Sequence, residues 1–223
     1  MFPGQLSERP RFSNGPVPLP FLSVGVRLFI VPPFFSQAVT QTKPLFSGWS
    51  FPWYQILLAF LSILILLFYY EKNDSRTLLV FPVLFTSGML FSTSFFCRFL
   101  SEITGAFDGN LIVTKPEDLV QWLFCLLNFL CAAFFEEVIY RFYFIDQFFS
   151  LITRKKVWPL SRIICELTGL LCFAFAHLYM GWISVLNAAF AHIFLRLCYK
   201  KIGKLWSCVL SHFIYNVISL ILL

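Results

Sequence analysis

Long apolar segments alternate with short polar ones along this chain of 223 residues. An α-helix that crosses a bilayer needs about 20 predominantly apolar residues. Segments close to that length predict helices at residues 21–39, 52–70, 77–97, 117–148, 160–178, 182–199 and 205–223. The pattern therefore predicts an all-α fold, a polytopic membrane helix bundle with about seven transmembrane helices.

The polar segments between these runs divide the chain. Residues 1–20 are rich in Pro, Ser and Gly and predict a flexible cytoplasmic tail. A polar turn at 71–76 and a polar loop at 98–117 separate the next spans, while Gly181 and Gly203 mark later turns. We expect three regions: the tail at 1–20, N-terminal transmembrane segments at 21–116 and a C-terminal helix core at 117–223.

Residues 21–39 are the weakest span because they contain Arg27 and the pair Pro32-Pro33. A kinked transmembrane helix, an interfacial helix and a signal peptide are the alternatives, and an arginine inside the apolar stretch argues against a signal peptide. Before the 117–148 helix, Thr114 and Glu117 have the T-x-x-E spacing of a capping box.

The composition agrees with a membrane protein. The chain is 59% hydrophobic and 13% charged, whereas soluble domains carry about 25% charged residues. Its net charge of +6 is therefore interpreted as a sign of membrane topology rather than of nucleic-acid binding. The seven cysteines lie in or beside apolar segments without a CxxC pair, which predicts buried, reduced thiols rather than a zinc ribbon or a disulfide framework.

The basic residues are distributed unevenly between the two sides of the predicted bundle. With seven spans, one side receives Arg9, Arg11, Lys72, Arg76, Arg154, Lys155, Lys156, Arg162, Lys200, Lys201 and Lys204, and the other receives only Lys43, Arg98 and Lys115. Because cytoplasmic loops carry the excess of Lys and Arg, we expect the N-terminus inside and the C-terminus outside.

The most unusual stretch is Phe134-Phe135-Glu136-Glu137-Val138-Ile139-Tyr140-Arg141, which places two carboxylates and a guanidinium in an apolar run. A charge in lipid costs at least ~2.5 kcal/mol, so an ionisable cluster there indicates a functional site. Glu137 and Arg141 are four residues apart and can form an ion pair, whereas Glu136 projects about 100° away. Helical spacing therefore leaves Glu136 as the carboxylate available for chemistry.

Polar side chains in the last three spans complete a candidate catalytic set. His177 ends the run Phe173-Ala174-Phe175-Ala176, whose small residues permit close helix approach, and His212 and Asn216 share one helix face. A buried carboxylate can act as a general base on water, with His177 positioning or polarising that water. His212 and Asn216 carry donors suited to a developing oxyanion.

The other polar residues in the spans are interpreted as structural. We expect His192 and Asn187 to link helices by hydrogen bonds. Glu166 is expected near the interface or paired with Arg162, which lies four residues before it, and Asp146 is expected to border a loop.

A zinc site is the competing chemical interpretation. Its ligands would be Glu136, His177 and His212. The sequence contains no HExxH motif and no close-set ligand pair. Zinc is therefore not favoured, and no cofactor is expected to be required.

Three motifs occur in order, each in its own apolar segment: Glu136-Glu137-x-x-x-Arg141, Phe173-x-x-x-His177 and His212-x-x-x-Asn216. In this pattern the chain resembles the CAAX protease and bacteriocin-processing (CPBP or Abi) family, which includes the type II CAAX prenyl endopeptidases. The resemblance covers about residues 117–223, which would form the catalytic core. It implies a glutamate-type intramembrane protease in which Glu136 and His177 activate water, His212 and Asn216 stabilise the oxyanion, and Glu137, Arg141 and Phe173 support them.

The resemblance also implies a substrate class and a location. The substrate would be a membrane-associated protein or peptide, lipidated or not, and the partners would include membrane lipids but no nucleic acid. The chain stops after the H-x-x-x-N helix, where the eukaryotic prenyl proteases carry another span, which favours a bacterial-type member in the cytoplasmic (inner) membrane. The alternatives are a non-catalytic bacteriocin-immunity or scaffold protein of the same family and a proton-relay transporter using Glu136 and the histidines.

The predicted helices pose a problem of depth. At 1.5 Å per residue, Glu136 lies ~26 Å from the outer end of its helix and His177 ~22 Å from the inner end of the next one. Straight antiparallel helices would place these side chains at different depths. A tilt, a later helix start or a broken helix is needed to bring them together.

Overall fold

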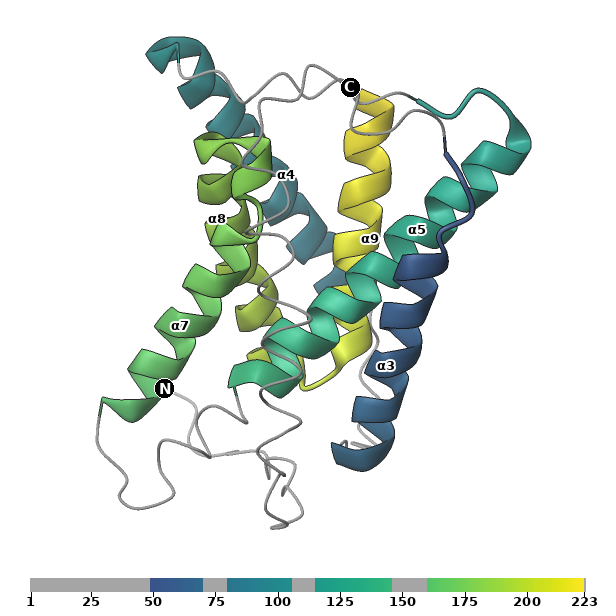
Figure 1. Ribbon diagram of the computed structural model, residues 1–223. Coiled ribbons are helices and arrows are strands. Elements are labelled where there is room, and N and C mark those ends of the chain that lie inside the picture. Colours follow the sequence, from purple (N-terminus) through teal and green to yellow (C-terminus); the bar gives the residue numbers. More distant parts are fainter. Residues whose placement is uncertain (1–48, 70–79, 106–114, 146–159, 223) are drawn as a thin grey trace.

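The computed structural model describes residues 49–69, 80–105, 115–145 and 160–222, and all regular elements within them are helical (Figure 1). Their order is α3 (Trp53–Tyr69), α4 (Val80–Thr104), α5 (Leu119–Glu137), the π-helix η1 (Val138–Tyr143), α7 (Ser161–Phe175), the 3-10 helix η2 (Leu178–Met180), α8 (Trp182–Ile202) and α9 (Leu205–Leu222). The all-α fold is thus confirmed for these ranges. The weak span at 21–39, the tail at 1–20 and Asp146 lie outside them.

Four helical segments of the described ranges are long and apolar enough to cross a membrane. They are α4, the continuous segment Leu119–Tyr143, α8 and α9. Helix α3 is apolar but shorter. The expected number of about seven spans therefore stays a prediction.

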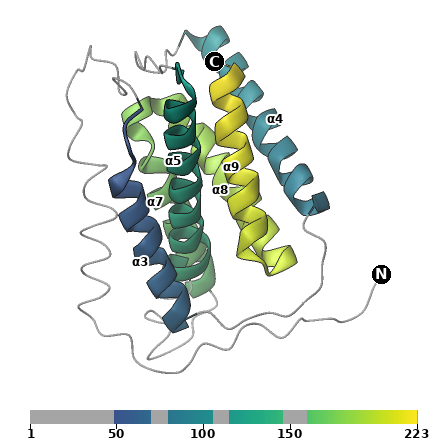
Figure 2. The same cartoon turned by 90° about the vertical axis from the view of Figure 1, so that its right-hand side faces the viewer.

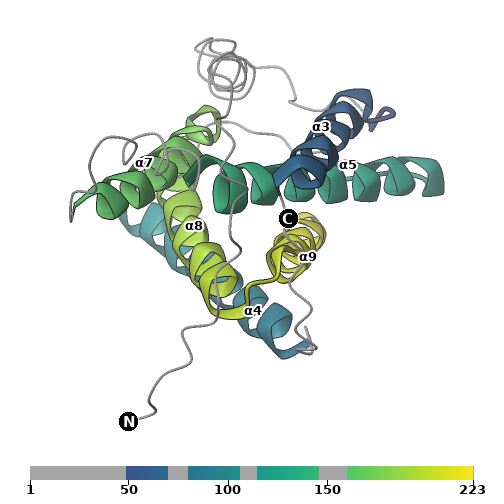
Figure 3. The same cartoon turned by 90° about the horizontal axis from the view of Figure 1, so that it is seen from below.

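The helices pack as a bundle in which α5 and α8 have central roles. Helix α5 contacts α3 and α9, while α8 contacts α4, α7 and α9 (Figures 1 and 2). Seen from below, α9 appears nearly end-on whereas α5 extends across the picture, so α5 is strongly inclined to α9 (Figure 3). Residues from four helices meet in a buried apolar core that includes Leu90, Phe134, Leu195 and Val209.

Helix α4 continues beyond its apolar run into the predicted polar loop. It ends at Thr104 rather than near residue 97. Two local interactions favour the extra turns: Arg98 and Glu102 approach to 3.8 Å across one turn, and the Thr104 hydroxyl donates to the Leu100 carbonyl. Gly105 follows with a φ of 64°, a left-handed conformation that ends a helix.

Helix α5 begins later than predicted. Its N-cap is Asp118, whose Oδ1 atom accepts a hydrogen bond of 2.8 Å from the backbone N–H of Gln121. The Gln121 amide oxygen in turn accepts from the backbone N–H of Glu117. The predicted capping box of Thr114 and Glu117 is therefore wrong: an aspartate caps the helix, and Thr114 lies outside the described residues.

The connection between α7 and α8 is short. Helix α7 ends at Phe175, and η2 leads to Gly181, whose φ of 100° turns the chain into α8. Gly203, with a φ of 71°, ends α8. Both glycines thus lie at the turns predicted for them, and His177 lies in the connection just beyond the end of α7 rather than within a helix.

Candidate active site

The two adjacent glutamates sit where α5 changes into the π-helix. Glu137 is the last residue of α5, and η1 starts at Val138. The change is visible in the hydrogen bonding, because the backbone N–H of Phe144 donates to the carbonyl of Ile139, five residues earlier. Single π-turns inside α-helices frequently occur at functional sites.

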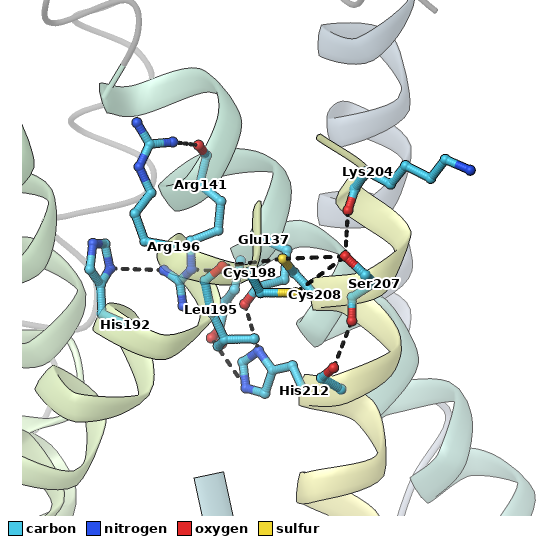
Figure 4. A network of polar contacts seen from close by, with 12 residues as sticks. Glu137, Arg141, His192, Leu195, Arg196, Cys198, Lys204, Ser207, Cys208 and His212 are labelled. Carbon is cyan, nitrogen blue, oxygen red and sulfur yellow. Dashed lines mark hydrogen bonds and ion pairs between the residues drawn. The ribbon is translucent and has the colours of Figure 1, made fainter. Parts of the chain in front are cut away.

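Glu137 forms the predicted ion pair with Arg141. Its Oε2 atom lies 3.1 Å from Nε of Arg141, and both side chains are 0% exposed. The two atoms are not aligned for a hydrogen bond, so this is a charge contact. The second carboxylate oxygen, Oε1, lies 2.9 Å from Nδ1 of His212 (Figure 4). Glu137 therefore joins α5 to both the π-turn and α9.

This contact fixes which nitrogen of His212 carries a proton. A carboxylate only accepts hydrogen bonds, so Nδ1 of His212 donates to Glu137. The other ring nitrogen, Nε2, lies 3.9 Å from Oε2 of Glu136. His212 is thus held by one glutamate and faces the other.

Glu136 has few partners of its own. Its side chain is 26% exposed, and Oε2 is buried without a hydrogen-bond partner among the described residues. The gap of 3.9 Å to His212 exceeds a direct hydrogen bond but lets one water molecule bridge both atoms. The arrangement therefore leaves one carboxylate oxygen and one imidazole nitrogen facing a common point.

Arg141 is compensated on several sides. Its NH1 atom donates to Nδ1 of His192 over 2.9 Å, and its guanidinium lies 4.2 Å above the ring centre of Phe173. Phe173 also contacts the rings of Tyr140 and His192. The structural role expected for His192 is confirmed, and the buried arginine is positioned by α7 and α8 as well as by Glu137.

The backbone of the π-turn is held by Arg196 of α8. One guanidinium nitrogen of Arg196 donates to the carbonyl oxygen of Arg141. The rest of the group pairs with Glu166 of α7 through two hydrogen bonds of 3.0 Å, and Lys200 approaches the same carboxylate to 2.7 Å. The expected pairing of Glu166 with Arg162 is therefore wrong, because Arg196 and Lys200 occupy both of its oxygens.

His177 and Asn216 make fewer contacts. Nδ1 of His177 donates to the carbonyl of Phe173 over 2.9 Å, because a carbonyl can only accept. Asn216 is half-buried one turn beyond His212. Asn187, the other amide in these spans, donates to the Tyr215 hydroxyl, as expected for a link between helices.

The contacts between the glutamate helix and α7 show the relative direction of these two segments. A Cβ atom on Gly169 would lie 2.8 Å from Ile145, and Phe173 contacts Arg141. Gly169 therefore lies beside Ile145, and Phe173, four residues later, lies beside Arg141, four residues earlier. The two segments thus run antiparallel.

The alternative zinc set is not assembled. Among the described residues no three His, Cys, Asp or Glu side chains are grouped closely enough to hold a metal ion. Glu136, His177 and His212 are all within that part of the chain. Only Glu136 and His212 approach each other.

Comparison with known families fits this geometry. Residues 118–218, from the N-cap of α5 into α9, match the family model described as type II CAAX prenyl endopeptidase Rce1-like. The match supports membership of the CAAX protease family. No curated protein and no solved structure matches the chain. All three motifs lie inside the matched segment.

Membership in the CAAX protease family supports a protease. Together with the long apolar helices it makes the chain an integral membrane protein. The family suggests CAAX protease activity within the membrane and does not favour the alternative functions.

Sequence reasoning missed Arg196 as a residue of this site. A signal was present, because His192, Arg196 and Lys200 are spaced four apart and form a polar stripe along α8. Arg162 and Glu166 have the same spacing on α7. Two such stripes on successive helices predict contact between them.

Proposed function

We propose that this protein is an intramembrane endopeptidase in which Glu136 activates a water molecule to hydrolyse a peptide bond. The carrying observation is that Oε2 of Glu136, without a hydrogen-bond partner among the described residues, faces Nε2 of His212 at 3.9 Å. A water bridging these atoms would be polarised from both sides. Glu136 would accept the proton as the water oxygen attacks the carbonyl carbon, and would return it to the leaving amine.

The remaining residues have supporting roles in this proposal. Glu137 would stabilise His212 as an imidazolium that is already protonated before the attack, so that its Nε2 N–H donates to the developing oxyanion while the proton of the water passes to Glu136. Asn216, on the same face of α9, would supply a second donor. His177, whose Nδ1 is fixed by the Phe173 carbonyl, would help position the water through Nε2.

The finer features of the proposal follow the expectations from the sequence. We propose a membrane-associated peptide or protein as substrate, lipidated or not, and a bacterial-type protein in the cytoplasmic (inner) membrane with its N-terminus inside. Membrane lipids would be partners, and nucleic acid would not. No metal enters the mechanism, so treatment with a chelator is expected to leave peptide hydrolysis unchanged, and purified protein to carry less than one zinc per chain.

The decisive experiment compares the wild type with Glu136→Gln on a library of lipidated and unlipidated peptides in detergent or vesicles. The substitution keeps the shape of the side chain but removes the base. A general base contributes ~10²- to 10⁴-fold, and we expect a loss in that range. Glu102→Gln is the matched control, because Glu102 is an exposed glutamate at the end of α4, and it should retain full activity. Hydrolysis that survives Glu136→Gln would refute the mechanism.

A further inference from the structure

A groove lies between α7 and α8, and Arg196 is among its lining residues. It has a volume of about 490 Å³. Apolar side chains such as Leu167, Ile193 and Leu197 line it together with the basic residues Arg162, Arg196 and Lys200. Leu167 and Leu197 are more than half exposed, so the groove opens on the surface that faces lipid.

The charges around this groove are not balanced. Glu166 is the one carboxylate among its lining residues, against three cations. Both oxygens of Glu166 are taken by Arg196 and Lys200. Arg162 is exposed and has no ion pair with any residue that the structure describes. An anion would complete the site.

The basic residues sit at one end of the groove, near the start of α7 and the end of α8. Arg162 is the second residue of α7 and Lys200 is the third from the end of α8. Helix ends of this kind lie at the level of lipid headgroups. Basic pockets between transmembrane helices bind the headgroups of anionic lipids.

A second observation points to a ligand deeper in the groove. His192 is 2% exposed and lines the groove. Because its Nδ1 accepts from Arg141, the neutral ring carries its proton on Nε2. That N–H is buried and has no hydrogen-bond partner among the described residues. A buried donor without an acceptor is costly, so an acceptor oxygen is expected there.

The basic end of the groove and the N–H of His192 are separated by about the distance between the phosphate and an ester carbonyl of a phospholipid. The ammonium of Lys200 reaches back to the carboxylate of Glu166, at the level of Arg196. His192 lies one helical turn deeper than Arg196, about 5 Å along the axis. A phosphate near Lys200 and Arg162 would therefore leave the ester carbonyl of the same lipid at the level of His192, with its acyl chain along the leucines.

We propose that this groove is a binding site for one anionic phospholipid. The phosphate would lie between Arg162 and Lys200, and an ester carbonyl would accept the N–H of His192. The proposal does not depend on catalysis. The bound lipid would, however, contact Arg196, whose guanidinium holds the backbone of the π-turn.

Native mass spectrometry of the full chain in detergent, titrated with phosphatidylglycerol or phosphatidylcholine, tests the proposal. We expect one phosphatidylglycerol bound with clear preference over phosphatidylcholine. Each basic residue near a lipid surface is worth about a fivefold change in binding, so Arg162→Gln and Lys200→Gln should each weaken phosphatidylglycerol binding about fivefold. Glycerol phosphate, the headgroup without chains, should not displace the lipid.

Two further variants keep the test sharp. Lys201→Gln removes the same charge at the same helix end outside the groove and should bind like the wild type. Leu167→Trp fills the groove without changing charge and should weaken binding, with the thermal midpoint of each variant confirming its fold. Equal binding of the two lipids, unchanged binding by Arg162→Gln and Lys200→Gln, or displacement by glycerol phosphate would overturn the proposal.

Discussion

Nδ1 of His212 lies 2.9 Å from Oε1 of Glu137, a carboxylate that is fully buried and also paired with Arg141. The two neighbouring glutamates therefore differ in their contacts: Glu137 holds one nitrogen of the imidazole, and Glu136 faces the other. A histidine held in this way keeps one tautomer, which is how carboxylates orient catalytic histidines elsewhere.

Replacing Glu137 should damage both stability and activity. Glu137→Ala leaves Arg141 buried without its carboxylate, and breaking a buried ion pair costs about 3–5 kcal/mol. We expect a large drop in the thermal midpoint measured by intrinsic fluorescence, together with loss of peptide hydrolysis. Glu136→Gln should instead abolish hydrolysis with a nearly unchanged midpoint. A neutral Glu136→Gln beside a damaging Glu137→Ala would show that the motif serves packing alone.

Arg196 should influence catalysis through the backbone of the π-turn. Arg196→Lys keeps the charge but loses the two-pronged contact with Glu166 and the bond to the Arg141 carbonyl. We expect kcat to fall while KM changes little, since the π-turn moves and the substrate site does not. Arg98→Lys is the matched control, because Arg98 is exposed on α4. Identical kcat values for Arg196→Lys and the wild type would contradict a positioning role.

The two amides in the spans should respond differently to substitution. Asn216→Ala removes a proposed oxyanion donor and is expected to lower kcat about 10²- to 10³-fold. Asn187→Ala removes a hydrogen bond to Tyr215 and should cost about 1 kcal/mol of stability with activity largely retained. Steady-state kinetics and thermal melting of both variants check this pair. Equal catalytic losses would argue against an oxyanion role for Asn216.

Gly169 should be sensitive to a single added methyl group. A Cβ there would lie 2.8 Å and 2.9 Å from two atoms of Ile145, and overpacking of this kind costs about 1–3 kcal/mol. Gly88 of α4 has nothing within 4 Å of the same position, so Gly88→Ala should be neutral or stabilising by up to about 1 kcal/mol. Thermal midpoints of the two alanine variants measure the difference. A Gly169→Ala variant as stable as Gly88→Ala would show that α7 and Ile145 are not in close contact.

Hydropathy was sufficient to predict the α-helices of the described ranges, because each contains an apolar run long enough to indicate a helix without information from its neighbours. Local spacing was also sufficient for Glu137 and Arg141, which lie on the same helix. The start of α5 was missed because Asp118 and Thr114 both offer a capping oxygen, and only the tertiary structure selects between them.

Contacts between helices were harder to predict. Arg162 is the nearest cation to Glu166 in sequence, yet Glu166 pairs with Arg196, which lies 30 residues away. Pairing across helices depends on the crossing and rotation of α7 and α8, and neither is encoded in the spacing of one helix. The same holds for His212, whose contact with Glu137 spans 75 residues, and for the π-turn, which has no simple sequence signature.

The π-turn makes this segment sensitive to length as well as to composition. A π-turn is a local widening of the helix, whereas each residue of a regular α-helix advances the chain by about 100°. Deleting one residue between Val138 and Tyr143 would convert the turn to α-helix and rotate one flank against the other. Every other side chain would remain, yet the faces bearing the glutamates and Ile145 would no longer meet their partners together. Insertions and deletions in this stretch should therefore be tolerated less well than most substitutions.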